Sequence, residues 1–193
     1  MARITYTVPE DLPAEKRSLL DTLSERTGSD AVVDHSLEGG TLNVYRAMGR
    51  NLELLEGFRD YGSDVWTAGG LTPHERELVI LATCHTAGNE YEWHQHVRVA
   101  LDEGMAPEAI LAISMDRPEE LEDRHAVLVE YVRHFVAAAV DDAHHDRLAT
   151  YYDEPTIVGI DVLAGLYLGL AHVIDALAVE TEVPFVGWEL ENL

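Results

Sequence analysis

The sequence has very few cationic side chains. Lysine and arginine total 13 against 36 aspartate and glutamate residues, the formal net charge is −23, and Lys16 is the only lysine. A surface of this sign repels phosphate backbones and anionic headgroups, so we expect no nucleic-acid and no membrane partner. Because molar salt screens such self-repulsion, the composition indicates a halophilic protein. The alternative is an acidic protein from an ordinary cytoplasm.

Cysteine occurs once, at Cys84. A single thiol excludes an intramolecular disulfide, a CxxC redox pair and a zinc site built on cysteine pairs. Cys84 lies in an apolar run and has no local partner that would activate it. A small core residue is therefore a simpler interpretation than a nucleophile.

Strand patterns are almost missing, apart from a short alternation at residues 4–8, and there is no long linker or low-complexity segment. Most of the 193 residues show helical periodicity, and this length suits a single domain with a sizeable core. We therefore expect an all-α fold. The first residues lack an apolar segment with a cleavage site, so we expect no signal peptide and a cytoplasmic location.

The expected helices are bounded by proline, glycine and capping residues. The strongest start is Thr72-Pro73-His74-Glu75, which has the form of a capping box with proline in the first helical position. The helix from there to about Ala87 is apolar nearly all round and should be buried. The other expected helices cover residues 13–26, 42–48, 51–66, 90–103, 108–114, 118–140, 141–152 and 155–180, with a loop at 28–40.

The last expected helix is also apolar on most sides. Asp161, His172 and Asp175 interrupt it, so we expect it to fall short of a membrane span. These polar groups need hydrogen-bond partners or line a pocket. Gly165 and Gly169, four residues apart, would let a neighbouring helix pack closely.

The candidate chemistry gathers around residues 77–96. Glu92 and His96 are four apart and share a helix face, where a carboxylate can orient an imidazole for acid–base work. Glu77, on the preceding apolar helix, must find a partner or shift its pKa upward. We hypothesise that Glu77, Glu92 and His96 meet across two helices. The alternative is that Glu77 pairs with Arg76 or another arginine, and that Glu92 and His96 form a solvated pair.

A metal site is not expected here. His94 and His96 are two apart, so helix geometry points them to different faces. Glu77, Glu92 and His96 are suitable ligand types, but no HExxH or paired ExxH motif supports them.

The motif resembles that of the carboxymuconolactone decarboxylase and alkylhydroperoxidase D-like (AhpD-like) family. The resemblance rests on Leu71-Thr72-Pro73-xx-Arg76-Glu77-Leu78-Val79-Ile80-Leu81, on Gly88-Asn89-Glu90-Tyr91-Glu92-Trp93-xx-His96, and on Gly104 with Pro107-Glu108. It implies an all-α helical bundle assembled as a homo-oligomer, such as a trimer or hexamer. The expected organisation is an N-terminal arm and helix (1–40), a family-like helical domain (41–183) and a C-terminal tail (184–193).

The resemblance also implies a site. In the peroxidase branch two cysteines fall at the positions of Asn89 and Glu92, so this chain lacks the thiol pair that peroxide reduction needs. The decarboxylase branch is more similar, and implies cofactor-free loss of CO2 from a small carboxylated lactone. His96 would be the acid–base group, with Glu92 and Glu77 completing a relay. Expected substrate-binding residues are Asn89, Trp93 and His172. The remaining alternatives are a peroxidase-type oxidoreductase and a non-catalytic oligomeric ligand-binding protein.

Overall fold

A computed structural model describes residues 1–21 and 41–193 of the chain. Within these residues the fold is all-helical, as predicted, and the only extended pairing is an isolated bridge between Asp21 and Thr41. Contacts gather into two compact units. One consists of Met1–Asp64 and Ile174–Pro184, and the other, called the central unit below, of Val65–Val173 and Phe185–Leu193. The domain boundaries expected after residues 40 and 183 stay a prediction.

The first unit is built on short helices. They are η1 (Pro9–Asp11), η2 (Ala14–Leu20), α1 (Asn43–Met48) and most of α2 (Leu52–Ala68). Arg46 of α1 holds the N-terminal arm, because its Nε donates to the Thr7 carbonyl at 3.1 Å and its guanidinium lies over the Tyr6 ring. The helix expected at 13–26 is a 3-10 helix in its described part. Its end and the loop expected at 28–40 lie outside the described residues.

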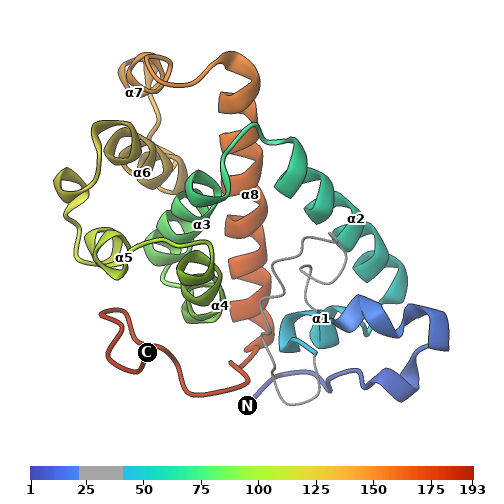
Figure 1. Ribbon diagram of the computed structural model, residues 1–193. Helices are drawn as coiled ribbons and strands as arrows, with labels where there is room; N and C mark the ends of the chain where they lie inside the picture. The colour runs from blue at the N-terminus through green and yellow to red at the C-terminus, as the bar shows by residue number, and fades with distance from the viewer. Residues whose placement is uncertain (22–40) are drawn as a thin grey trace. The chain divides into compact units, whose positions relative to one another are not determined.

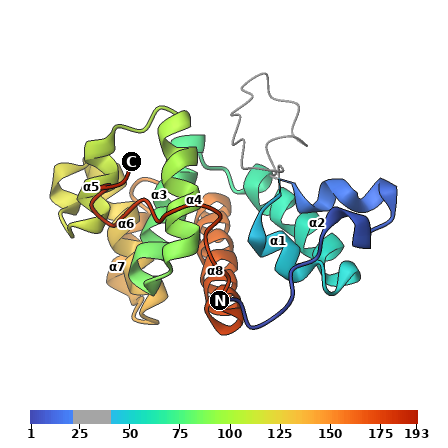
Figure 2. The ribbon, with the colours of Figure 1, turned by 90° about the horizontal axis from the view of Figure 1, so that it is seen from below.

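The central unit is organised around α3 (Pro73–Ala87). This helix packs against α4 (Glu90–Asp102), α5 (Pro107–Ser114) and α6 (Asp123–Val136), with α8 (Glu154–Leu177) nearby (Figures 1 and 2). Its consecutive residues 77–84 are all buried, which confirms the prediction from its all-round apolar character.

Both ends of α3 follow the sequence signals. The Thr72 hydroxyl accepts the Glu75 N–H at 3.2 Å, and Glu75 Oε2 accepts the Thr72 N–H at 3.0 Å, so the predicted capping box is formed. Gly88 ends the helix in the left-handed region, with φ of 68°, where glycine meets no steric penalty. Asn89 then caps α4 directly, so only two residues separate α3 from α4.

The helix expected at 118–140 is broken. Residues Pro118–Glu120 form a 3-10 turn (η4), Leu121 is extended, and α6 runs only from Asp123 to Val136. Leu121 packs against the core cluster, so burial of its side chain outweighs the helical pattern. The chain then continues into α7 (Asp142–Leu148), which is capped by Asp141.

Helix α8 is more apolar than expected. By length and composition this helix could cross a membrane, and its most apolar window has a mean hydropathy of 2.0. The prediction that Asp161, His172 and Asp175 would make it too polar for a membrane span is therefore wrong. Core helices of soluble proteins meet the same criteria, and 44% of that window is buried. Asp161 accepts the Tyr131 hydroxyl at 2.9 Å, whereas His172 and Asp175 are exposed.

Candidate functional site

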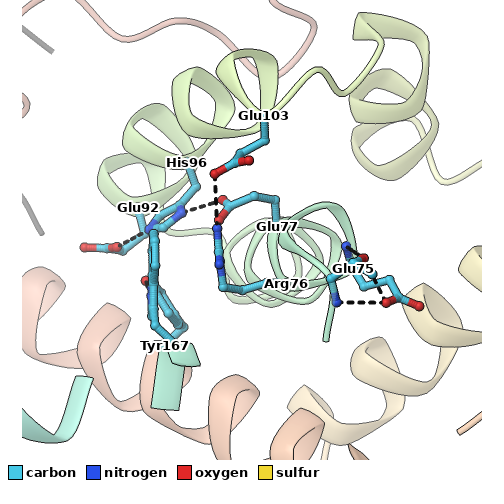
Figure 3. A network of polar contacts seen from close by, with 9 residues as sticks. Glu75, Arg76, Glu77, Glu92, His96, Glu103 and Tyr167 are labelled. Carbon is cyan, nitrogen blue, oxygen red and sulfur yellow. Dashed lines mark hydrogen bonds and ion pairs between the residues drawn. The ribbon is translucent and has the colours of Figure 1, made fainter. Parts of the chain in front are cut away.

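The centre of the candidate site is a direct contact between α3 and α4. His96 Nδ1 lies 2.7 Å from Glu77 Oε2, and both side chains are buried (Figure 3). The short turn at Gly88 and Asn89 brings the two helices side by side, which places these residues opposite one another. A buried carboxylate at this distance orients the imidazole.

Glu92 lies on the other side of the same imidazole. Its Oε2 is 3.7 Å from His96 Nε2, longer than a hydrogen bond, and its side chain is also buried. Glu92 and His96 are therefore a buried pair, and the alternative of a solvated pair considered from the sequence is wrong. Glu92 occupies the first turn of α4, where the helix dipole favours a carboxylate. His96 thus has one close carboxylate on Nδ1 and a second within reach of Nε2.

Aromatic side chains and an arginine surround this group. The Tyr167 ring meets the His96 ring edge-on, with centroids 4.9 Å apart, and its hydroxyl accepts the Trp66 Nε1–H at 3.0 Å. Arg76 stacks over the Trp66 ring at 4.0 Å and donates from Nε to Glu77 Oε1 at 3.2 Å. Trp66 and Tyr167 could not be identified from the sequence, because they come from α2 and α8, far from the motif.

Asn89 is a structural cap in this chain. Its Oδ1 accepts the Glu92 N–H at 2.9 Å, and its Nδ2 donates to the Ala171 carbonyl of α8 at 3.2 Å. These two hydrogen bonds fix the start of α4 and thereby the position of the Glu92 carboxylate.

Trp93 faces the C-terminal tail. Its indole is fully buried, donates from Nε1 to the Gly187 carbonyl at 3.1 Å and packs against Trp188. Figure 2 shows the tail running across α4. Phe185 and Trp188 therefore anchor the tail to the core. The contacts described for Trp93 and for the exposed His172 do not join either residue to the Glu77–His96 pair.

Cys84 is enclosed in the core. Burial, followed by the charges of Glu92 and Glu77, raises the pKa of its thiol well above the ordinary value. A neutral, inaccessible thiol is a poor nucleophile. Across the residues that the structure describes, no group of three or more histidine, cysteine or acidic side chains is arranged to hold a metal ion.

Comparisons with known proteins agree with this architecture. Residues 53–117 match the carboxymuconolactone decarboxylase family. A search of curated proteins found no match to the sequence. Three solved structures share the fold, all at low sequence identity, so they carry no statement about activity.

The first is an alkylhydroperoxidase AhpD core from Ralstonia eutropha, described as an uncharacterised peroxidase-related protein (14% identity, TM-score 0.77, covering 93% of this chain and 92% of that one). The second is a peroxidase-related protein from Silicibacter (19%, 0.71, 94% and 94%). The third is the debrominase Bmp8 in complex with 2,3,4-tribromopyrrole (16%, 0.67, 83% and 88%). The match over residues 53–117, together with the shared fold, supports the resemblance to the carboxymuconolactone decarboxylase and AhpD-like family drawn from the motif.

Proposed function

We propose that the protein is a cofactor-free acid–base enzyme that moves a proton on a small carboxylated lactone or related acid, with decarboxylation as the reaction. The observation that carries the proposal is the buried His96, with Glu77 at 2.7 Å from Nδ1 and Glu92 at 3.7 Å from Nε2. General acid–base catalysis needs an imidazole of this kind. A carboxylate orients one ring nitrogen, and the other nitrogen can exchange a proton with the substrate.

In the proposed reaction the bond between the substrate carbon and its carboxylate breaks, and CO2 leaves. The electron pair enters the conjugated lactone carbonyl and forms an enolate. His96 then delivers a proton from Nε2 to carbon, and Glu92 or water returns a proton to that nitrogen. Glu77 stays on Nδ1 throughout and holds the ring in place. No cofactor enters these steps.

Thiol peroxidase activity is the disfavoured alternative. Peroxide reduction by this family's motif uses cysteines where this chain has Asn89 and Glu92. Cys84 cannot take their place, because it is buried and its thiol pKa is raised. A non-catalytic ligand-binding protein remains the second alternative, and the experiment below separates it from the enzyme.

The test is CO2 release from carboxymuconolactone in molar KCl by the wild-type protein and by His96→Asn and Glu92→Gln. His145→Ala, at an exposed histidine of α7, is the control for the loss of an imidazole elsewhere. We expect wild-type and His145→Ala to turn over, and His96→Asn to lose about 100- to 10,000-fold in rate. A folded wild-type protein without turnover would contradict this substrate. Equal rates in wild-type and His96→Asn would contradict the role of His96.

We also propose, from the family resemblance, that the protein is a homo-oligomer. An exposed strip of small and apolar residues along α8 supports the proposal: Val158, Val162, Gly165, Gly169 and Val173. Light scattering coupled to gel filtration measures the state directly. The substrate-binding roles of Asn89, Trp93 and His172, the cytoplasmic location and the halophilic origin stay predictions.

A further inference from the structure

Arg76 reaches its neighbour Glu77 in a way that helix geometry alone does not favour. Side chains one residue apart on a helix point about 100° away from each other and do not normally meet. Here Arg76 Nε nevertheless donates to Glu77 Oε1 at 3.2 Å, and only 12% of the arginine side chain is exposed. Something outside α3 must therefore hold the guanidinium in this position.

Two other helices supply that support. The guanidinium lies 4.0 Å from the centre of the Trp66 ring, a cation–π contact with the end of α2. One of its terminal nitrogens is 3.5 Å from Glu103 Oε1, at the end of α4 (Figure 3). Trp66 is itself fixed by its hydrogen bond to Tyr167, whose ring packs on His96. The contacts thus form a closed circuit from Arg76 through Glu77 and His96 and back through Tyr167 and Trp66.

The two oxygens of Glu77 have separate partners within this circuit. Oε1 faces Arg76 and Oε2 faces His96 Nδ1. Arginine has only donors, so Oε1 must accept. An ionised carboxylate is an acceptor at both oxygens, so Nδ1 of His96 must carry the hydrogen.

We propose that Arg76 is a positioning residue whose cation, held on Glu77 Oε1, locks the hydrogen of His96 on Nδ1 and leaves Nε2 as the nitrogen that exchanges protons. This inference rests on the proposed function for its catalytic meaning, since it states which nitrogen faces the substrate. Its physical content, the tautomer of one imidazole, is independent of any substrate. Without the Arg76 cation, Glu77 loses its donor on Oε1, the His96 hydrogen is no longer confined to Nδ1, and Nε2 no longer remains the single exchanging position.

The test is ¹⁵N NMR of the His96 side chain in full-length protein, assigned by its disappearance in His96→Asn. In wild-type protein at neutral pH we expect the ring hydrogen on Nδ1, where it is donated to Glu77. In Arg76→Gln we expect a substantial part of the Nδ1 proton population to move to Nε2 or to the carboxyl. A wild-type ring protonated only on Nε2 would overturn the proposal, and so would an Arg76→Gln ring identical to wild-type.

Two variants separate the effect of Arg76 from general effects. Arg98→Gln removes the same charge from α4, and no contact described for Arg98 reaches Glu77, so we expect the wild-type tautomer. Arg76→Lys keeps the charge without the planar fork, so we expect Nδ1 to stay protonated. If Arg76→Gln does not fold, Arg76→Lys and Glu103→Gln decide the question in its place. Loss of the Nδ1 proton in Arg76→Lys, in a folded protein, would contradict control by charge.

A second readout applies if the lyase activity is found. Arg76→Gln should then lower kcat by about 10- to 100-fold with little change in KM, because Arg76 acts through Glu77 and not on the substrate. A rise in KM at unchanged kcat would assign Arg76 to substrate binding and overturn a positioning role. Absence of turnover in wild-type protein would overturn the proposed function only, because the NMR result needs no substrate.

Discussion

His94 has two ring nitrogens with different surroundings. Nδ1 accepts the Val186 N–H at 3.0 Å, and Nε2 is buried with no hydrogen-bond partner among the described residues. Burial, assisted by the charge of Arg98, lowers the pKa of His94 from 6.5 to about 4. The ring therefore stays neutral at pH 7, with its proton on Nε2, and this neutral form is the one that holds the tail residue Val186.

This residue should make folding sensitive to mild acid. As pH falls from 6.5 towards 4, the unfolded state binds a proton at His94 and the folded state does not, so stability decreases. We expect the difference in unfolding free energy between pH 7 and pH 4.5 to be about 1–2 kcal/mol larger for wild-type than for His94→Asn. Asparagine keeps an acceptor for Val186 but does not titrate. Urea unfolding at both pH values measures this difference. An equal difference in wild-type and His94→Asn would refute the prediction.

At the scale of elements, two glycines of α8 have opposite surroundings. A Cβ on Gly159 would lie 2.3 Å from the Gly69 carbonyl oxygen and 2.7 Å from its Cα, so the backbones of α8 and the α2–α3 connection touch there. A Cβ on Gly169 would meet nothing within 4 Å. The close helix approach expected at Gly165 and Gly169 is therefore not seen at Gly169, and the tightest backbone contact of α8 is made by Gly159 with the α2–α3 connection.

We expect Gly159→Ala to destabilise the fold by about 3 kcal/mol or more, because a backbone cannot yield as a flexible side chain can. Gly169→Ala should be neutral or stabilising by up to about 1 kcal/mol, since alanine is the better helix former. Thermal unfolding of both variants beside wild-type measures the difference. A Gly159→Ala protein as stable as Gly169→Ala would contradict the described contact. Any change of oligomeric state in Gly169→Ala would report on the exposed strip.

Helix positions could be predicted where the signals are local. The capping box at Thr72 and the stop at Gly88 fix α3, because the groups that satisfy its free N–H and C=O groups are adjacent in sequence. The start of α6 could not be predicted, since Leu121 is extended for a reason that lies in the core. Helix caps are determined by residues adjacent in sequence. The point at which a helical pattern is interrupted depends on which side chains are buried in the core.

The candidate site also contains residues that local spacing could predict and residues that depend on tertiary packing. The spacing of Glu92 and His96 placed them on one face, and the proximity of Glu77 followed as a hypothesis from its buried helix. Trp66 and Tyr167 could not be found, because their contacts depend on how α2 and α8 pack. Trp93 lies within the motif, but its position there did not indicate that its indole donates to the Gly187 carbonyl of the tail.

At the scale of the whole molecule, the net charge of −23 predicts a dependence on salt. Self-repulsion of the folded surface is screened over about 10 Å at 0.1 M salt and over about 3 Å at 1 M. We expect the unfolding free energy to rise by several kcal/mol between about 0.1 M and about 2 M KCl, and Tm with it. Sorbitol at the same osmolality is the control for effects without charge. Stability that is constant or falls with KCl would contradict the halophilic interpretation.

The cap formed by Asn89 makes a cysteine pair costly to introduce at this site. Such a pair would require both Asn89→Cys and Glu92→Cys. The first change removes the Glu92 N–H acceptor and the bond to the Ala171 carbonyl, at a cost of about 1 kcal/mol or more. The second removes one carboxylate of the proposed relay. Each change alone therefore removes a contact of the candidate site before a thiol pair exists, so engineering a cysteine pair here requires both substitutions and a replacement for the lost cap.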